Sequence, residues 1–231
     1  MLLKGLQKLT LLDYPGKMAC TVFVGGCNFQ CPFCHNASLA LGERVSKTDT
    51  IATEEFFSFL QKRRGILEGV CVSGGEPTLM PDLISFLNNI KEMGFLVKLD
   101  TNGYRPDVLK KAVSLSLVDY VAMDIKSSKE SYAKTAALPD IDISKIEESV
   151  DFLMSGSVDF EFRTTLVKGL HTEEDIIKIG EWISGNEKYF LQGFVDSGDL
   201  ISKGFDGFDK NETEKLLKLL KPYVPNAQIR G

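Results

Sequence analysis

The sequence predicts an α/β fold, in the form of an incomplete, laterally open (β/α)6 TIM-like barrel of parallel strands. Short apolar runs rich in β-branched residues alternate with amphipathic segments, which is the pattern of parallel strands joined by right-handed crossovers. About six such units can be counted, two short of the eight in a closed (β/α)8 barrel. Polar clusters follow several of the strands directly. A doubly wound open sheet is the alternative architecture.

Length and composition predict one soluble domain over residues 1–231. The chain has 231 residues, 43% of them hydrophobic, which suits a single α/β domain with a substantial core. A net charge of −5 argues against a general nucleic-acid binder. No apolar run approaches the ~20 residues that span a bilayer, and the N-terminus lacks a signal-peptide pattern. Five cysteines, three of them clustered, fit a reducing cytoplasm better than a disulfide framework.

The first half of the chain contains the opening hairpin and the first strands of the barrel. Residues 2–12 alternate loosely and run into the turn Asp13–Gly16, so a hairpin-like lead into the first barrel strand at 19–24 is expected. A polar connection then continues to about Ile51. The elements that follow are a helix with Thr53 as its N-cap, a strand at 69–73, a helix at 82–90, a strand at 95–99 and a helix with Pro106 in its first turn.

The second half continues the alternation. A loop rich in Ser, Lys and Asp is expected after the first strand of this half, and Thr172–Asp175 resembles a capping box. The predicted elements are a strand at 118–123, a helix at 146–154, a strand at 160–167, a helix at 176–183, a strand at 189–195, a helix at 212–220 and a last short strand at 227–229.

Three cysteines with spacings of four and three residues, Cys27, Cys31 and Cys34, form the most informative stretch. Thiolates this close repel one another unless a cation neutralises them, and metal coordination does so by removing the thiol protons. Structural zinc sites usually have four protein ligands, so a set of three indicates a reactive centre with one open position. The preceding Gly25-Gly26 allows the backbone to turn tightly around such a centre.

Two other interpretations of these cysteines are open. His35 could complete a Cys3His zinc site, although adjacent residues such as Cys34 and His35 seldom bind one metal together. A redox Cys-x-x-Cys motif would leave Cys27 without a role. Cys20 and Cys71 lie in apolar, strand-like runs, and we expect both to be dispensable for any metal centre.

Three further polar motifs also follow predicted strands: Gly74–Pro77, Asp100–Gly103 and Asp124–Lys126. Strand-to-helix loops of a parallel barrel all lie at the carboxyl ends of the strands, so the motifs should share one site with the cysteines. The glycines allow close backbone approach to a ligand, with Glu76 near a ligand ammonium. Asp124 and Lys126, two residues apart, point to the same face and suit a zwitterionic ligand, whereas the alternative is a local salt bridge.

Two isolated polar residues lie outside these motifs. Arg163 lies inside an apolar strand, where it could pair either with a ligand carboxylate or with an acid inside the barrel. His171 precedes a helix N-terminus, and we expect a surface or capping role for it rather than a catalytic one.

The spacing Cys-x-x-x-Cys-x-aromatic-Cys resembles the signature of the radical S-adenosylmethionine (SAM) enzymes. The run Cys34-His35-Asn36 and the motif Asp100–Gly103 are similar to those of the subgroup that activates glycyl radical enzymes. The resemblance implies a [4Fe–4S] cluster on the three cysteines and SAM bound at its open iron. It implies no side-chain catalyst beyond these cofactors, because the reaction is hydrogen-atom abstraction. The implied cofactor-binding residues are Phe33, His35, Gly74, Gly75, Glu76, Asp100, Asp124, Lys126 and Arg163.

The whole chain resembles the anaerobic ribonucleoside-triphosphate reductase activating proteins. That resemblance implies a glycine of an anaerobic ribonucleotide reductase as substrate and a flavodoxin-like or ferredoxin-like electron donor, with no nucleic acid or membrane partner. Some related activases have a histidine near the ribose of SAM, where this chain has Gln192. The alternatives are activation of pyruvate formate-lyase, a small-molecule substrate, or a non-enzymatic iron–sulfur or zinc module.

Overall fold

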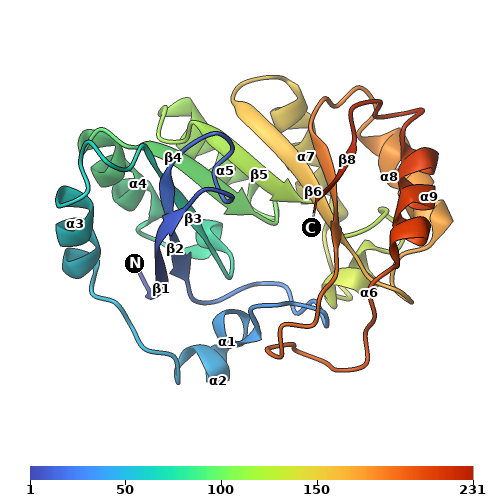
Figure 1. The fold of residues 1–231 in the computed structure, drawn as a ribbon, viewed down its shortest axis with the longest axis horizontal. Coiled ribbons are helices and arrows are strands. Elements are labelled where there is room, and N and C mark those ends of the chain that lie inside the picture. Colours follow the sequence, from blue (N-terminus) through green and yellow to red (C-terminus); the bar gives the residue numbers. More distant parts are fainter. Residues whose placement is uncertain (231) are drawn as a thin grey trace.

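The computed structural model describes residues 1–230, which form one curved, eight-stranded sheet in the order β1 to β8 (Figure 1). β1 is antiparallel to β2, and all the following pairs are parallel. Among residues 1–230, β1 and β8 are the two ends of the sheet and are not paired with each other, so the barrel is open, as predicted. The strands are β1 (Leu3–Thr10), β2 (Ala19–Val24), β3 (Gly69–Gly74), β4 (Leu96–Thr101), β5 (Tyr120–Asp124), β6 (Asp159–Leu166), β7 (Tyr189–Gly193) and β8 (Gln228–Arg230).

Six longer helices flank the sheet (Figure 1). Each of them buries one apolar stripe. In α4, for example, Phe86, Leu87 and Ile90 are buried at helical spacing. Strands β2 to β5 are buried on both faces, which is typical of parallel sheets covered by crossover helices. These helices are α3 (Thr53–Gln61), α4 (Leu83–Glu92), α5 (Pro106–Ser114), α7 (Ile143–Met154), α8 (Glu173–Trp182) and α9 (Lys210–Leu220).

Most of the predicted elements are confirmed, including the opening hairpin, the capping box at the start of α8 and the short last strand. The proposed N-cap Thr53 is wrong, because Ala52 occupies that position and Thr53 is already helical. Within residues 1–230, no helix is both long and apolar enough to cross a membrane.

The sequence did not predict the short helices that lie in two polar connections. They are α1 (Ala37–Ala40), α2 (Gly42–Val45) and α6 (Tyr132–Ala136), together with a 3-10 turn at Pro77–Leu79. Helices of four or five residues are unstable alone, so tertiary contacts decide whether they form, and sequence periodicity does not reveal them.

Candidate active site

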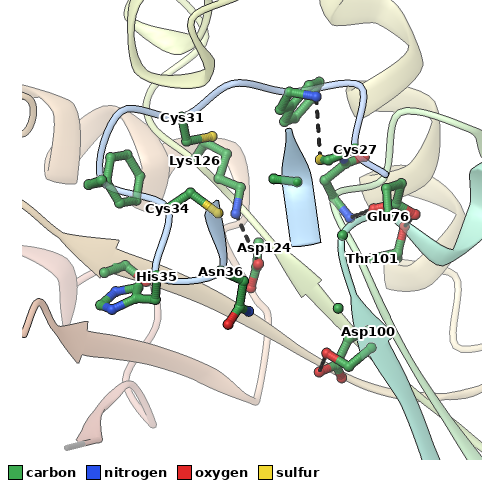
Figure 2. Close-up of a pocket in the computed structure, with 18 of the residues that line it drawn as sticks. Cys27, Cys31, Cys34, His35, Asn36, Glu76, Asp100, Thr101, Asp124 and Lys126 are labelled. Atoms are coloured by element: carbon green, nitrogen blue, oxygen red, sulfur yellow. Dashed lines mark hydrogen bonds and ion pairs between the residues drawn. The ribbon is translucent and has the colours of Figure 1, made fainter. Parts of the chain in front are cut away.

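All twelve residues proposed for the cluster and the cofactor line one cavity of about 190 Å³ at the carboxyl ends of the strands (Figure 2). The sequence placed their motifs in separate strand-to-helix loops, and the parallel topology brings those loops together. They are Cys27, Cys31, Phe33, Cys34, His35, Gly74, Gly75, Glu76, Asp100, Asp124, Lys126 and Arg163.

The cysteine loop packs backbone to backbone against the glycine-rich loop that follows β3. The amide of Glu76 donates to the carbonyl oxygen of Gly26 at 2.8 Å. A Cβ atom at Gly75 would lie only 2.1 Å from that same oxygen, so only glycine fits there. Gly26 itself has a φ of 99°, which favours glycine. Gly26 and Gly75 thus allow the cysteine loop and the glycine-rich loop to contact each other closely at the edge of the cavity.

The three thiols surround the cavity, with Cys27 on one side and Cys31 and Cys34 on the other (Figure 2). Burial raises the pKa of Cys27 to about 12 and that of Cys31 to about 11, while the nearby Lys126 ammonium opposes the rise. Burial likewise raises the pKa of Cys34. The sulfurs are therefore protonated at neutral pH, and a metal centre would have to displace these protons as it binds.

The donor set suits a cluster better than a single metal ion. Among residues 1–230, no group of three or more His, Cys, Asp or Glu side chains is spaced to hold one ion. Each thiolate of a cubane cluster binds a different iron, so its ligands stand further apart than those of one zinc ion. The imidazole of His35 packs on Phe194 with ring centroids 5.3 Å apart and points away from the cysteines (Figure 2). That orientation disfavours the Cys3His interpretation.

A chain of alternating charges crosses the floor of the cavity. Arg163 donates from Nε to Asp124 at 2.9 Å, and Lys126 donates to the other carboxylate oxygen at 3.0 Å. Arg163 also lies 3.6 Å from Asp100, which pairs with the buried Lys98. Of the two roles considered for Arg163, the structure shows pairing with acids inside the barrel.

These charges fix the protonation of the carboxyl groups. Burial alone would raise the pKa of Asp124, but Arg163 and Lys126 outweigh it and hold that pKa well below its usual range. The pKa of Asp100 is lowered by Lys98 and Arg163 against the same effect of burial. Both carboxylates are therefore ionised, and they keep the neighbouring cations in place.

A sequence model of the radical SAM superfamily matches residues 21–183. The chain belongs to the radical SAM superfamily. Members of this family use a [4Fe–4S] cluster and SAM, so the two predicted cofactors are confirmed. The three-thiol donor set of the cavity fits such a cluster, because it leaves one iron open.

The relatives of this radical SAM protein include activating enzymes, one of which aligns over almost its full length. It is 34% identical to the "Putative glycyl-radical enzyme activating enzyme MJ1227" of Methanocaldococcus jannaschii, over 99% of this chain and 95% of that one. It is 32% identical to the "Pyruvate formate-lyase-activating enzyme" of Streptococcus mutans, over 74% of this chain and 68% of that one. The predicted enzyme class, a radical SAM glycyl-radical activating enzyme, is therefore confirmed.

Solved structures confirm the fold. A radical SAM methyltransferase from Sphaerobacter thermophilus superposes with a TM-score of 0.72 at 13% identity, over 96% of this chain and 68% of that one. Streptococcus suis SuiB bound to SAM gives a TM-score of 0.68 at 14% identity, over 91% of this chain and 52% of that one. At these identities the likeness concerns the fold alone.

Glu76 of this radical SAM site is bonded within the protein. Its side chain is 1% exposed and accepts hydrogen bonds from the amides of Thr78 at 3.0 Å and Asn102 at 2.7 Å. The hydroxyls of Thr78 and Thr101 also donate to it. Burial raises the pKa of this carboxyl group, which the four donors oppose. Glu76 therefore fastens the glycine-rich loop to the loop after β4.

Sequence reasoning missed two polar residues beside the predicted ones. Lys98 is 1% exposed, and its position two residues before Asp100 on β4 puts both side chains on one face. An isolated lysine in an apolar strand was the available signal. Asn102, inside a motif that was already recognised, donates to Asn28 at 2.8 Å and lies 3.9 Å from the Cys27 sulfur. Gln192 is absent from the cavity lining.

The expectation of a surface or capping role for His171 is wrong. Its side chain is 3% exposed, and its Nε2 lies 2.8 Å from the carbonyl oxygen of Lys126. The amide of Val167 donates to Nδ1 at 3.1 Å, so the neutral ring carries its proton on Nε2 and donates to Lys126. The ring also packs edge-on against Phe33. The loop after β6 folds inward, and His171 supports the backbone of the Asp124–Lys126 motif.

Proposed function

We propose that this protein activates a glycyl radical enzyme by removing a hydrogen atom from the Cα of one glycine in it, and that the partner is an anaerobic ribonucleotide reductase. The observation that carries the proposal is the set of three thiols that line one cavity together with an ordered row of charges. Similarity to a glycyl-radical activating enzyme over 99% of the chain supports it. A flavodoxin-like or ferredoxin-like protein is the proposed electron donor.

In this proposal Cys27, Cys31 and Cys34 hold the cluster. When bound, the cluster and SAM supply the radical chemistry, and the protein supplies binding, orientation and exclusion of competing reactions. The cysteine loop is kept in shape by its contact with the glycine-rich loop, where Glu76 is bonded on both sides. Rigid support of this kind is what a reactive centre needs, because small displacements cost large factors in rate.

The charged row is the proposed binding site for the zwitterionic end of SAM. Its methionine part carries an ammonium and a carboxylate, which complement alternating anions and cations. Asp124 is held ionised between Arg163 and Lys126, so the row needs no proton transfer to receive such a ligand. Phe33 and His35, in the cysteine loop beside the cavity, are proposed to line the adenine side.

A second candidate partner is pyruvate formate-lyase. Proteins named "Pyruvate formate-lyase-activating enzyme" from Streptococcus mutans and Clostridium pasteurianum are 32% and 33% identical to this chain over 74% and 52% of its length. We favour the ribonucleotide reductase because the chain as a whole resembles its activating proteins.

The test uses protein reconstituted anaerobically with iron and sulfide, reduced with dithionite and supplied with SAM. Candidate glycyl radical proteins from the same organism, one reductase and one lyase, are added separately, and electron paramagnetic resonance is recorded. We expect a glycyl doublet on the reductase and formation of 5′-deoxyadenosine. A doublet only on the lyase would identify pyruvate formate-lyase, and not the reductase, as the partner. SAM turnover on a small metabolite with no doublet on either protein would overturn the activating function.

A further inference from the structure

The end of the cysteine loop is held by a segment more than 150 residues away in the chain. Residues 194–202, which we call the strap, follow β7 and run alongside residues 32–44. Four places of the strap form hydrogen bonds with this stretch. The hydroxyl of Ser197 donates to the carbonyl of His35 at 3.2 Å, and the backbone amide of Ser202 donates to the carbonyl of Pro32 at 2.9 Å. Arg44 donates to the carbonyl of Leu200 at 3.0 Å, and Asp199 accepts from the start of α1.

Asp199 makes the densest of these contacts. Its carboxylate accepts from the amide of Ser38 at 2.9 Å, and its carbonyl accepts from the amide of Ala37 at 3.2 Å. Arg44 lies 3.5 Å from the other carboxylate oxygen. The first amides of any helix need acceptors from outside it. Asn36, the local N-cap residue of α1, makes no side-chain cap, so the distant Asp199 takes that role.

The position of α1 matters because this helix closes the cysteine loop. The amide of Gly26, just before Cys27, donates to the carbonyl of Leu39 in α1 at 2.7 Å. The entrance and the exit of the loop are thereby tied together. Cys34 lies three residues before Ala37, the first residue of α1, so the anchor of α1 also determines where Cys34 stands.

We propose that Asp199 is a positioning residue for the cluster, and that the strap is a second, sequence-distant part of the structure that holds the cysteine loop. This inference rests on the proposed role of Cys34 as a cluster ligand. Groups that orient metal ligands typically change metal affinity by 10–100-fold when removed. Residues 194–202 form neither a helix nor a strand. The strap is held against the cysteine loop by the buried side chain of Leu200 and by the hydrogen bonds to Pro32 and His35.

The chain offers a matched control in Asp209. That residue caps α9 in the same manner, accepting from the amide of Glu212 at 2.9 Å, but it belongs to a helix that contributes nothing to the cavity lining. Asp199→Ala and Asp209→Ala each remove one cap carboxylate. Asp199→Asn keeps an oxygen acceptor for Ser38 and loses the ion pair with Arg44.

The experiment measures iron per chain after anaerobic reconstitution, the rate at which a chelator removes that iron, and the melting temperature of each variant. We expect Asp199→Ala to lose iron about tenfold faster than the wild type, and Asp209→Ala to match the wild type within about twofold while its melting temperature falls. Asp199→Asn should stay close to the wild type, because the hydrogen bond rather than the charge positions α1.

Equal chelation rates for Asp199→Ala and Asp209→Ala would overturn the inference while leaving the proposed function intact. A wild-type protein that takes up no iron would instead overturn the proposed function. If Asp199→Ala does not fold, Ser197→Ala removes the hydrogen bonds that the Ser197 hydroxyl makes with the carbonyl of His35 and with the amide of Asp199. A chelation rate in that variant equal to that of the wild type would then overturn the inference.

Discussion

The two ends of the barrel both contain buried charges, but they are arranged differently. At the amino ends of the strands, Glu161 is 1% exposed and forms a two-pronged pair with Arg230 at 2.8 and 3.1 Å. The hydroxyl of Tyr120 donates to the same carboxylate. At the carboxyl ends, the row formed by Lys98, Asp100, Arg163, Asp124 and Lys126 contains three cations and two carboxylates.

This difference in arrangement distinguishes a structural ion pair, at the amino ends, from a candidate binding site, at the carboxyl ends. The pair at the amino ends is balanced one to one and has no charge left for a ligand. The row at the carboxyl ends instead borders the cavity, where Lys126 lies beside Cys31 and Cys34 (Figure 2). Thiols become anions when they bind a metal, so a cation beside them lowers the cost of that change. In this protein the buried charges that indicate function are those that line a cavity together with the cysteines.

The largest expected effect concerns the cysteines. Alanine at Cys27, Cys31 or Cys34 should abolish stable cluster binding and SAM cleavage, because a cubane loses one of its only three protein ligands. Iron and sulfide analysis after anaerobic reconstitution should give about four irons per chain for the wild type and almost none for these variants.

The control is the double variant Cys20→Ala with Cys71→Ala, since both of these thiols are fully buried in the strands. It should bind iron like the wild type. Loss of iron in this double variant would show that the cluster ligands are misassigned. Stoichiometric zinc without iron in the wild type would instead support a zinc site.

The next effect tests the two ends directly. Lys126→Met should weaken SAM binding at least about tenfold, or 1.4 kcal/mol, while iron content stays near that of the wild type. Arg230→Met should leave SAM binding unchanged but lower the free energy of unfolding by about 3 kcal/mol. The reason is that the variant leaves the buried carboxylate of Glu161 without its charged partner. Calorimetric titration with SAM and denaturant unfolding measure the two quantities.

A matched surface control is Lys129→Met, which removes an exposed lysine paired with Glu147. Exposed pairs contribute little, so both quantities should stay near the wild-type values. Should Lys126→Met bind SAM as tightly as Lys129→Met does, the pair of Asp124 and Lys126 would be only a salt bridge, and the distinction between the two ends would fail.

The fold could be predicted because its signals are periodic and local. Strands such as 19–24 and 69–73 are continuous apolar runs, and each is followed by helical spacing or a recognisable motif. The same reasoning missed α1 and α6, because helices this short form only through contacts such as the cap from Asp199. No local sequence pattern indicates that the capping residue of α1 lies 161 residues further along the chain.

The membership of the site could also be predicted, but its internal bonding could not. The motifs after the strands identified every proposed residue that lines the cavity except Arg163, which lies inside β6. That Glu76 joins two loops, and that Arg163 pairs with two acids, depends on distances between loops that the sequence leaves open. His171 was misplaced for the same reason, since a histidine before a helix cap is equally compatible with a surface position.

The smallest expected effect concerns His171 and the pH dependence of stability. Burial lowers the pKa of His171 in the folded protein, and its bond to the carbonyl of Lys126 only partly opposes this. The unfolded chain, with a pKa of about 6.5, therefore takes up the proton first as the pH falls. The stability of the neutral, buried ring is fully present above about pH 6.5 and declines as the pH drops toward the folded pKa.

The measurement is the free energy of unfolding of the wild type and of His171→Gln at pH 7.5, 6.5 and 5.5. Glutamine keeps one donor and one acceptor but does not titrate, so its variant should lose less stability between pH 7.5 and 5.5. Burial also lowers the pKa of His35, the other histidine, so His35→Gln is measured in parallel to separate the two contributions. Identical slopes for the wild type and His171→Gln would mean that the ring does not stay neutral beneath the Asp124–Lys126 motif, and the support that it gives to the carboxyl end of the barrel would then need another explanation.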